Sequence, residues 1–235
     1  MNVNKITNPP SHIAIIPDGN RRWAREHMLN LYNGYNLGIK KFIDVSLWAK
    51  KLGVRTISVW ALSTENLSNR SQQELSILYS LYKRAAYDKS LLKKLERNKA
   101  RVNIIGDSSK LPKDLNAALQ SVKEKTKDND ELSINILLDY GGRDDLLYAV
   151  KRLMGRKGKI KLTYDTIKQN LRSALVPDID LVIRTSGEQR TSGLLPWQTS
   201  YSEFYFSKKY WPSFNRDDLR IAIEDFSNRQ RRFGK

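Results

Sequence analysis

Short apolar runs alternate with segments of helical periodicity along most of the chain. The apolar runs have the length and composition of strands buried on both faces. They predict strands over residues 13–16, 55–62, 101–106, 132–138, 180–184 and 203–206. Between them, apolar residues three and four positions apart predict helices over residues 21–51, 71–98, 112–122, 144–156, 165–175 and 216–232. Strands that alternate with helices indicate the α/β class, as a single domain with a mainly parallel six-stranded sheet flanked by helices.

Glycine and proline refine the boundaries of this domain. Gly34 and Gly38 interrupt the first helical segment and predict a break near residues 33–35. Residues 1–11 are polar and contain two prolines, so they predict a loose N-terminal leader. Residues 12–235 are then expected to form the folded domain.

The predicted helix over residues 71–98 begins with a recognisable capping signal. Ser71 is followed three residues later by Glu74, which is the pattern of a capping box. The apolar side of this helix fits either a plain core or the wall of an extended cavity, and the residues concerned include Leu75, Leu78, Tyr82 and Ala85.

Composition and charge narrow the class of protein. No run approaches the roughly 20 apolar residues of a membrane span. The absence of Cys excludes disulfides, thiolate metal sites and cysteine nucleophiles, and it fits the reducing cytoplasm. With two His residues, a His-rich zinc site is not expected. The net charge of +17 attracts nucleic acid, anionic lipid or polyanionic substrates, but it is spread along the whole chain, as on a solvated surface.

The end of the first predicted strand carries the strongest local sign of chemistry. Asp18, Gly19 and Asn20 follow the strand and lead into a helix that begins at about Arg21. Open α/β sheets bind ligands at the carboxyl ends of their strands, and the first turn of a helix offers unpaired N–H groups. With Asn20 as N-cap and Arg21 and Arg22 beside it, the segment predicts an anion site, with Asp18 placed to hold a divalent cation. The alternative is an ordinary turn with a capping Asn and surface arginines.

Two further polar segments follow strands of the same predicted sheet. Residues 63–70 come after the second strand and residues 184–192 after the fifth, so both are expected at the edge that carries residues 18–22. Neither the GxxxxGK[ST] phosphate loop nor the GxGxxG nucleotide fingerprint occurs in the sequence. The residues alone therefore predict a Mg²⁺-dependent enzyme that handles phosphate or diphosphate. The arginines that these two segments add, and that suit bidentate contacts with phosphate oxygens, are Arg70, Arg184 and Arg190.

Several longer motifs occur in order along nearly the whole chain. They are His12–Ala24 (HIAIIPDGNRRWA), Ala61–Asn66 (ALSTEN), Asp139–Arg143 (DYGGR), Asp180–Arg190 (DLVIRTSGEQR), Pro196–Gln198 (PWQ), Ser202–Phe206 (SEFYF), Tyr210–Pro212 (YWP) and Arg229–Gly234 (RQRRFG). In content, order and spacing these motifs resemble those of the cis-prenyltransferases, the undecaprenyl diphosphate synthase family. The resemblance is closest to the archaeal-type members.

The resemblance implies an activity, a cofactor and partners. It implies that isopentenyl diphosphate is added to an allylic prenyl diphosphate to give a cis-polyprenyl diphosphate, with Mg²⁺ as the cofactor. It also implies a homodimer in which each sheet and its helices enclose a hydrophobic tunnel for the growing chain. Asp18 is implied as the essential Mg²⁺ ligand, helped by Glu203, and Asp18 and Asn66 as the catalytic residues. The implied substrate-binding residues are Gly19, Asn20, Arg21 and Arg22 for the allylic diphosphate, Arg184, Arg190 and Ser192 for isopentenyl diphosphate, and Ser63, Thr64, Glu65, Asn66 and Arg70 in a mobile segment.

The chain departs from the family pattern at three positions. Leu31 and Tyr35 stand where many members have Arg and His beside the allylic site, and Gln189 stands where His is usual near the isopentenyl site. Two polar contributors beside the allylic diphosphate are therefore absent, and an irregular head-to-middle or short-chain condensation, or transfer to another acceptor, is kept as an alternative. A non-catalytic partner subunit is less favoured because Asp18 and Glu203 are retained. Nucleic-acid binding is not expected, because no motif of interleaved aromatic and basic residues accompanies the net positive charge. Contact with a membrane surface is compatible with that charge.

Overall fold

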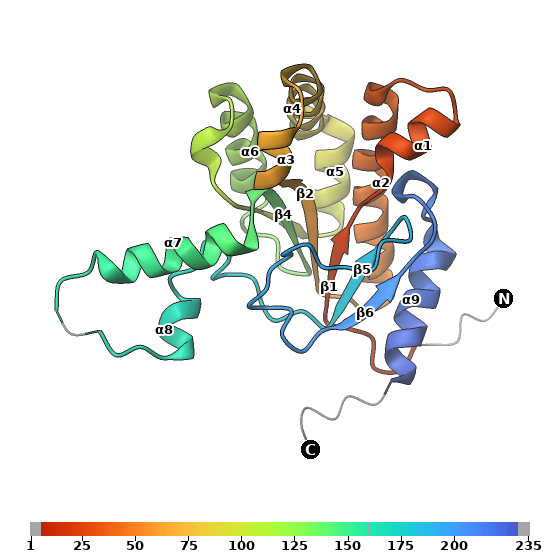
Figure 1. The fold of residues 1–235 in the computed structure, drawn as a ribbon. Helices are drawn as coiled ribbons and strands as arrows, with labels where there is room; N and C mark the ends of the chain where they lie inside the picture. The colour runs from red at the N-terminus through yellow and green to blue at the C-terminus, as the bar shows by residue number, and fades with distance from the viewer. Residues whose placement is uncertain (1–5, 159, 230–235) are drawn as a thin grey trace.

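The computed structural model describes residues 6–158 and 160–229. Its helices and strands alternate along the chain, as the sequence predicts (Figure 1). In chain order they are β1 (His12–Ile16), α1 (Asn20–Glu26), α2 (Leu31–Lys51), β2 (Thr56–Ser63), α3 (Thr64–Asn69), α4 (Gln72–Tyr87), α5 (Lys89–Arg97), β3 (Ala100–Ile105), the 3₁₀ turn η1 (Ser108–Lys110), α6 (Lys113–Lys125), β4 (Leu132–Tyr140), α7 (Gly142–Met154), α8 (Tyr164–Lys168), β5 (Leu181–Arg184), β6 (Glu203–Phe206), the 3₁₀ turn η2 (Trp211–Ser213) and α9 (Arg216–Asn228).

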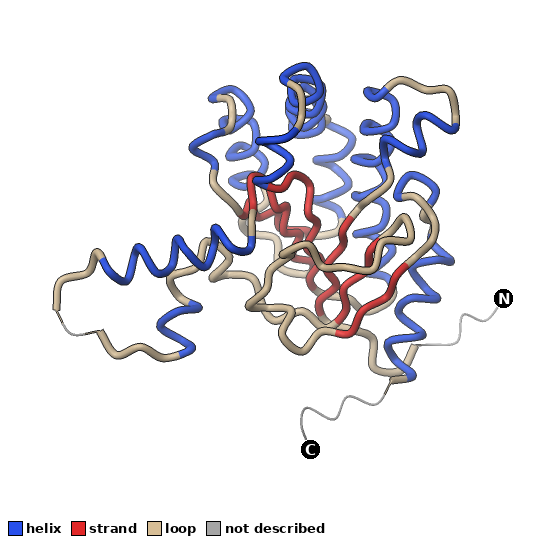
Figure 2. The backbone as a smooth tube through the Cα atoms, viewed as in Figure 1, coloured by secondary structure: helices blue, strands red, loops and turns tan. Residues whose placement is uncertain are grey.

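The six strands form one sheet in the order β3-β4-β2-β1-β5-β6 (Figure 2). Every neighbouring pair is parallel, so the prediction of a mainly parallel six-stranded sheet is confirmed. After β1 the chain moves to β2 on one side, and it later returns to the other side of β1 as β5. The carboxyl ends of β1 and β5 therefore meet at the point where an open sheet binds its ligand.

Alternate residues of each strand face two different layers. Ile13 and Ile15 of β1 pack with residues of α2, α5, α6 and α9 in one core cluster. Ala14 and Ile16 face a second cluster that includes Val182 of β5 and residues of the segment 176–195. Successive side chains of a strand point to opposite faces of the sheet, and each face is covered by one of these clusters. The strands are therefore continuous apolar runs in the sequence.

The first helical segment breaks earlier than its glycines predicted. The break lies at residues 27–30, where Met28 has a left-handed φ of 53°, and α2 then runs without interruption through Gly34 and Gly38. A Cβ on Gly34 would lie 2.8 Å from Ala24 Cβ, and one on Gly38 would lie 2.3 Å from Asn20 Oδ1. The two glycines therefore let α1 pack closely on α2, and the predicted break at residues 33–35 is wrong.

The predicted helix over residues 71–98 is two helices. Asp88 ends α4 with an extended backbone and caps α5, because its carboxylate accepts hydrogen bonds from Ser90 N and Leu91 N. The predicted helix over residues 165–175 is shorter, because α8 ends at Lys168. The last helix ends at Asn228, and residues 230–232 of its predicted span lie outside the described residues.

The described part of the predicted leader contacts the body. Ile6 packs against the main core cluster and Pro10 is buried, while residues 1–5 lie outside the described residues. Helix α7 and the short α8 project from the sheet as an arm (Figure 1). In the described ranges we find no helix with the length and apolar character of a membrane span.

Candidate active site

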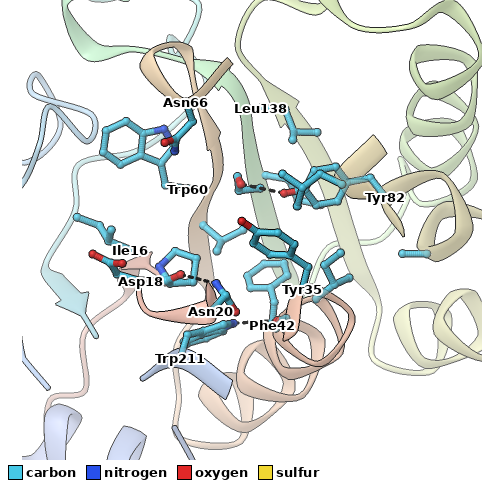
Figure 3. Close-up of a pocket in the computed structure, with 18 of the residues that line it drawn as sticks. Ile16, Asp18, Asn20, Tyr35, Phe42, Trp60, Asn66, Tyr82, Leu138 and Trp211 are labelled. Carbon is cyan, nitrogen blue, oxygen red and sulfur yellow. Dashed lines mark hydrogen bonds between the residues drawn. The ribbon is translucent and has the colours of Figure 1, made fainter. Parts of the chain in front are cut away.

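A cavity of about 1370 Å³ opens at the carboxyl edge of the sheet and extends between the sheet and its helices. It is larger than the ~300–1,000 Å³ of common small-molecule sites. Figure 3 shows Asp18 and Asn20 on one side of this cavity and Tyr82 and Leu138 on the other. Its polar lining contains Asp18, Gly19, Asn20, Arg21, Arg22, Ser63, Glu65, Asn66, Arg70, Glu74, Arg184, Glu188, Arg190 and Ser192. All the implied substrate-binding residues except Thr64 therefore line one cavity.

Asp18 lies at the centre of the polar end, directly after β1. Its Oδ2 atom is 2.9 Å from Arg184 Nη2 at the end of β5, and its Oδ1 atom is 3.3 Å from Arg22 Nη2. Oδ1 also accepts a hydrogen bond of 2.7 Å from the Gly19 backbone N–H. Gly19 has a φ of 97° and precedes α1, and a Cβ there would lie 2.5 Å from Tyr210 Cδ1. Only glycine fits this turn.

Asn20 does not cap the helix as predicted. Gly19 is the N-cap residue and Asn20 is the first residue of α1. The Asn20 side chain instead donates from Nδ2 to the carbonyl oxygen of Pro17 at 2.9 Å. This bond fixes the turn that carries Asp18, so Asn20 supports the turn through a different contact.

A second group of charges forms around the loop after β5. Arg184 is 5% exposed and donates from Nη1 to Ser192 Oγ at 2.8 Å and to the Arg190 carbonyl at 2.6 Å. Glu188 contacts Arg22 at 3.4 Å and Arg190 at 2.5 Å. The hydrogen bond from Arg190 lowers the pKa of Glu188 below its ordinary value. At the cavity mouth, arginines of this group therefore form ion pairs with both Asp18 and Glu188.

A third group lies where the polar end meets the interior. Glu74 of α4 is 8% exposed and lies 3.2 Å from Arg70 Nε and 3.6 Å from Arg21 Nη1. It also accepts a hydrogen bond from the Tyr35 hydroxyl. Burial raises the pKa of Tyr35 above its ordinary value, so this hydroxyl stays protonated and donates. Three residues from three different segments therefore meet at the carboxylate of a fourth.

The interior of the cavity is apolar. The Tyr82 hydroxyl is bonded to the Ala61 carbonyl at 2.8 Å, so its ring faces the cavity without an unpaired polar group. The rest of this wall includes residues of α2, α4, α5, α6, β3 and β4, namely Ile39, Phe42, Leu78, Ala85, Leu91, Leu92, Leu95, Val102, Leu119, Ile134, Ile136 and Leu138.

The structure does not bring Glu203 to Asp18 within one chain. Glu203 opens β6 level with Leu181, which pairs with Ile13 near the start of β1. Asp18 lies about five residues, or ~16 Å, further along the strand direction. Glu203 Oε2 contacts Arg229 Nη1 at 2.7 Å instead. A single chain therefore does not form a metal site from Asp18 and Glu203 together.

Thr64 also lies outside the main cavity. It lines a smaller cavity of about 190 Å³ together with Asp139, whose side chain is fully buried. Neither Asp139 carboxylate oxygen has a hydrogen-bond partner in the described part of the chain, and Lys110 Nζ lies 4.0 Å away. Burial accordingly raises the pKa of Asp139.

The residues at the polar end fit a Mg²⁺ ion held together with a diphosphate. Within residues 6–158 and 160–229 no cluster of three or more His, Cys, Asp or Glu side chains is arranged to hold a metal. Mg²⁺ in phosphate-handling sites is typically held by one or two carboxylates plus substrate phosphates and water. Asp18 offers such a carboxylate, because its side chain is 30% exposed and lines the cavity among arginines.

For two carboxylates of this site, Glu188 and Glu74, the sequence predicted no role in the site. Glu188 lies between Arg184 and Arg190 in the loop after β5, where its position among arginines could have indicated it. Glu74 was assigned to a capping box, and Ser71 does cap α4 by accepting from Glu74 N at 3.2 Å. The Glu74 side chain, however, turns to the arginines, a contact that its spacing of four residues from Arg70 could have indicated.

Comparison with known proteins identifies the family. The family model described as "Putative undecaprenyl diphosphate synthase" matches residues 16–234. An isoprenyl transferase of Streptococcus thermophilus (strain CNRZ 1066) is 40% identical over 238 residues, covering 97% of this chain and 94% of that protein. The tritrans,polycis-undecaprenyl-diphosphate synthase (geranylgeranyl-diphosphate specific) of Methanocaldococcus jannaschii is 39% identical over 235 residues, covering 97% and 84%. Bacterial and archaeal relatives are thus similar to the chain to nearly the same degree.

A solved structure has the same fold throughout. Lavandulyl diphosphate synthase from Lavandula x intermedia, in complex with dimethylallyl diphosphate, superposes with a TM-score of 0.91 at 31% identity. The alignment covers 97% of this chain and 99% of that one. With the fold, the cavity and these matches in agreement, the chain belongs to the undecaprenyl diphosphate synthase family of prenyltransferases.

Proposed function

We propose that this protein is a Mg²⁺-dependent cis-prenyltransferase that adds isopentenyl diphosphate to an allylic prenyl diphosphate and releases a cis-polyprenyl diphosphate. The observation that carries the proposal is the single cavity that joins a cationic mouth to an apolar interior. A prenyl diphosphate has the same two parts, a charged head and a hydrocarbon tail. The names of the relatives support the same reaction.

The two anion-binding groups suit two diphosphate substrates. Arg21 and Arg22, with the first turn of α1, bind the allylic diphosphate beside Asp18. Arg184, Arg190 and Ser192 bind isopentenyl diphosphate at the end of β5. The allylic tail enters the apolar wall, and the C1 carbon of the allylic substrate then faces the double bond of isopentenyl diphosphate. Positioning of two bound reactants supplies a large part of the rate acceleration in such a step.

In the condensation, the bond from C1 to the diphosphate oxygen breaks and a new carbon–carbon bond forms. The electron pair of the broken bond leaves with the diphosphate, and a proton leaves C2 of the isopentenyl unit. Arginine side chains stabilise the charge on the departing diphosphate. Asp18 would hold Mg²⁺, which when bound adds positive charge beside that leaving group. Ser63, Glu65 and Asn66 line the cavity from the end of β2 and α3, and this segment limits access of water to the reacting carbons.

A second regiochemistry is a candidate on the same site. The similarity to lavandulyl diphosphate synthase in complex with dimethylallyl diphosphate favours it, as do Leu31 and Tyr35, which replace charged or ionisable groups. In this alternative, an allylic diphosphate also acts as the acceptor.

Labelled isopentenyl diphosphate, Mg²⁺ and a panel of allylic primers test the function directly. Extension of a primer by one or more isopentenyl units is the expected result. Product formed from dimethylallyl diphosphate alone would establish the irregular condensation instead. No product with any primer would contradict both.

We further propose that the enzyme is a homodimer that contacts membrane surfaces. Large exposed apolar side chains on the projecting α7–α8 arm, such as Met154 at 80% exposure and Tyr164 at 84%, support a partner there. Met28 is 95% exposed near Arg25 at the α1–α2 turn, which supports contact with anionic lipid. Analytical ultracentrifugation is expected to give twice the chain mass. Anionic vesicles are expected to bind the protein in low salt and release it near physiological ionic strength.

A further inference from the structure

The contacts of Glu74 conflict with its local sequence role. At the third position of α4 after the Ser71 cap, a Glu side chain normally reaches back to the N-cap backbone. Here the side chain is only 9% exposed and its carboxylate turns to Arg70, Arg21 and Tyr35. A residue that leaves a favourable local bond for a buried cluster at a ligand cavity is typical of a functional constraint.

The way in which Arg70 is held leaves most of its donors available. Glu74 Oε1 lies 3.2 Å from Arg70 Nε as an ion pair, and Nε has no hydrogen-bond partner in the described part of the chain. The guanidinium carbon lies 5.6 Å from the centre of the Tyr35 ring, which supports it from one side. Neither terminal nitrogen of Arg70 has a hydrogen bond or ion pair to any residue in the described ranges, and the side chain is 15% exposed in the cavity lining. The terminal nitrogens are the donors that bind a phosphate bidentately.

The terminal nitrogens of Arg22 and Arg184 are engaged to a greater degree. Arg22 contacts Glu188 through Nη1 and Asp18 through Nη2, and Arg184 contacts Ser192 and Asp18 through its two terminal nitrogens. Arg70 is therefore a cation that is both fixed in place and open to an added anion. What fixes it is Glu74, and what orients Glu74 is Tyr35, which is 6% exposed.

We propose that Glu74 is a positioning residue for diphosphate recognition: oriented by the Tyr35 hydroxyl, its carboxylate holds Arg70 through an ion pair on the Nε side, so that the terminal nitrogens bind the substrate diphosphate. The inference rests on the proposed function for the identity of the anion. It also gives Tyr35 a role, because its hydroxyl is committed to Glu74 and so acts on the diphosphate through Arg70.

A double-mutant cycle on the full chain tests this role with inorganic pyrophosphate and Mg²⁺ as the probe. Calorimetry measures the pyrophosphate Kd, and steady-state kinetics measure KM and kcat for the allylic substrate. Because charged hydrogen bonds are lost, Arg70→Gln is expected to raise the Kd by about 10- to 100-fold. Glu74→Gln is expected to raise it about tenfold in the native background, but less than about twofold in the Arg70→Gln background, since the exposed Arg21 contact contributes little.

Tyr35→Phe is a milder second variant that keeps the charge of Glu74. It is expected to raise the pyrophosphate Kd and the allylic KM by about three- to tenfold, with kcat changed less. Tyr140→Phe is the matched control, because the Tyr140 hydroxyl also donates from a buried position to a carboxylate, Asp145 Oδ2, at 3.1 Å. It is expected to lower the melting temperature without changing the pyrophosphate Kd.

Two results would overturn the inference. Tighter pyrophosphate binding by Glu74→Gln would mean that the carboxylate only competes with the anion for the arginines. Equal effects of Glu74→Gln with and without Arg70 would mean that Glu74 acts independently of it. Failure of the proposed condensation is recognised separately, because it abolishes product formation by the native protein while pyrophosphate binding is still measured.

Discussion

Replacing Asp18 tests the centre of the proposed site. Asp18→Asn keeps the size of the side chain but removes its charge, and with it the carboxylate that would hold Mg²⁺ beside the diphosphate. Metal and leaving-group stabilisation of roughly 3–5 kcal/mol corresponds to a loss of about 10²- to 10⁴-fold in turnover. Asp18→Ala also loses volume and is expected to lie at or beyond the upper end of that range.

The same change has a smaller effect on folding. Asp18 pairs at 2.9 Å with Arg184, which is 5% exposed, but the Asp18 side chain itself is 30% exposed. Breaking a fully buried pair costs about 3–5 kcal/mol, and solvent screening reduces the cost here to about 1–2 kcal/mol. For a chain of this size the melting temperature should then fall by about 2–8 °C. Arg184 keeps its bonds to Ser192 and to the Arg190 carbonyl, so the fold should survive.

The assay combines turnover, melting temperature and binding of Mn²⁺ in the presence of inorganic pyrophosphate. Asp44→Asn is the control, because Asp44 is a carboxylate paired with Lys94 at 3.6 Å outside the cavity lining, and its side chain is 44% exposed. It should leave turnover and Mn²⁺ binding unchanged. Near-normal turnover of Asp18→Asn that still requires Mg²⁺ would contradict this role of Asp18 and mean that other residues hold the metal.

Three further predictions concern buried titratable groups and the cavity wall. Burial lowers the pKa of His12 to about 4, so below pH ~6.5 the unfolded chain takes up a proton that the folded protein does not. Up to about 3 kcal/mol of the free energy of unfolding should therefore be lost as the pH falls from 6.5 to 4. An NMR titration midpoint near 6.5 for His12 would contradict this. Burial raises the pKa of Asp139, so the destabilising effect of its carboxylate grows as the pH rises from about 4 toward that pKa. Asp139→Asn should therefore stabilise the protein by about 1–3 kcal/mol at pH 7.5 and lose that advantage near pH 4, as measured in melting experiments. Asn tolerates the left-handed φ of 46° at this position. Ala85→Phe fills part of the apolar wall and should shorten the product by at least one isoprene unit in chromatography of the chain lengths, whereas Leu147→Phe on the exposed face of α7 should leave the length unchanged.

Local sequence patterns determined the strands and the segments that carry the chemistry. The apolar run at the start of β1 and the Asp-Gly-Asn turn after it are decided by neighbours a few residues apart, so both were predictable. The same holds for Ser71 as the cap of α4. Because parallel strands have their carboxyl ends at one edge of the sheet, residues 18–22 and 184–192 could be predicted to lie at that edge.

Helix interruptions were less predictable, because the residues that weaken a helix by propensity were not the residues at which the helix breaks. Gly34 and Gly38 weaken a helix by propensity, yet they lie inside α2 because α1 and Trp211 pack against them. The actual break comes at Met28, a residue without a turn preference. At Asp88 a local capping bond ends one helix and starts the next, and this signal was present in the sequence.

The strands, most helices, the parallel sheet and the residues gathered at its carboxyl edge could therefore be predicted from the sequence. The pairing of charges within that site depends on contacts between residues far apart in the sequence. Asp18 and Arg184 are 166 positions apart and meet because β1 and β5 are neighbours, while Glu203, whose motif also belongs to the family pattern, lies at the opposite edge. Helical hydrogen bonds, capping bonds and side-chain periodicity act over a few residues, whereas the partner of a buried carboxylate such as Glu74 depends on which helices pack around it.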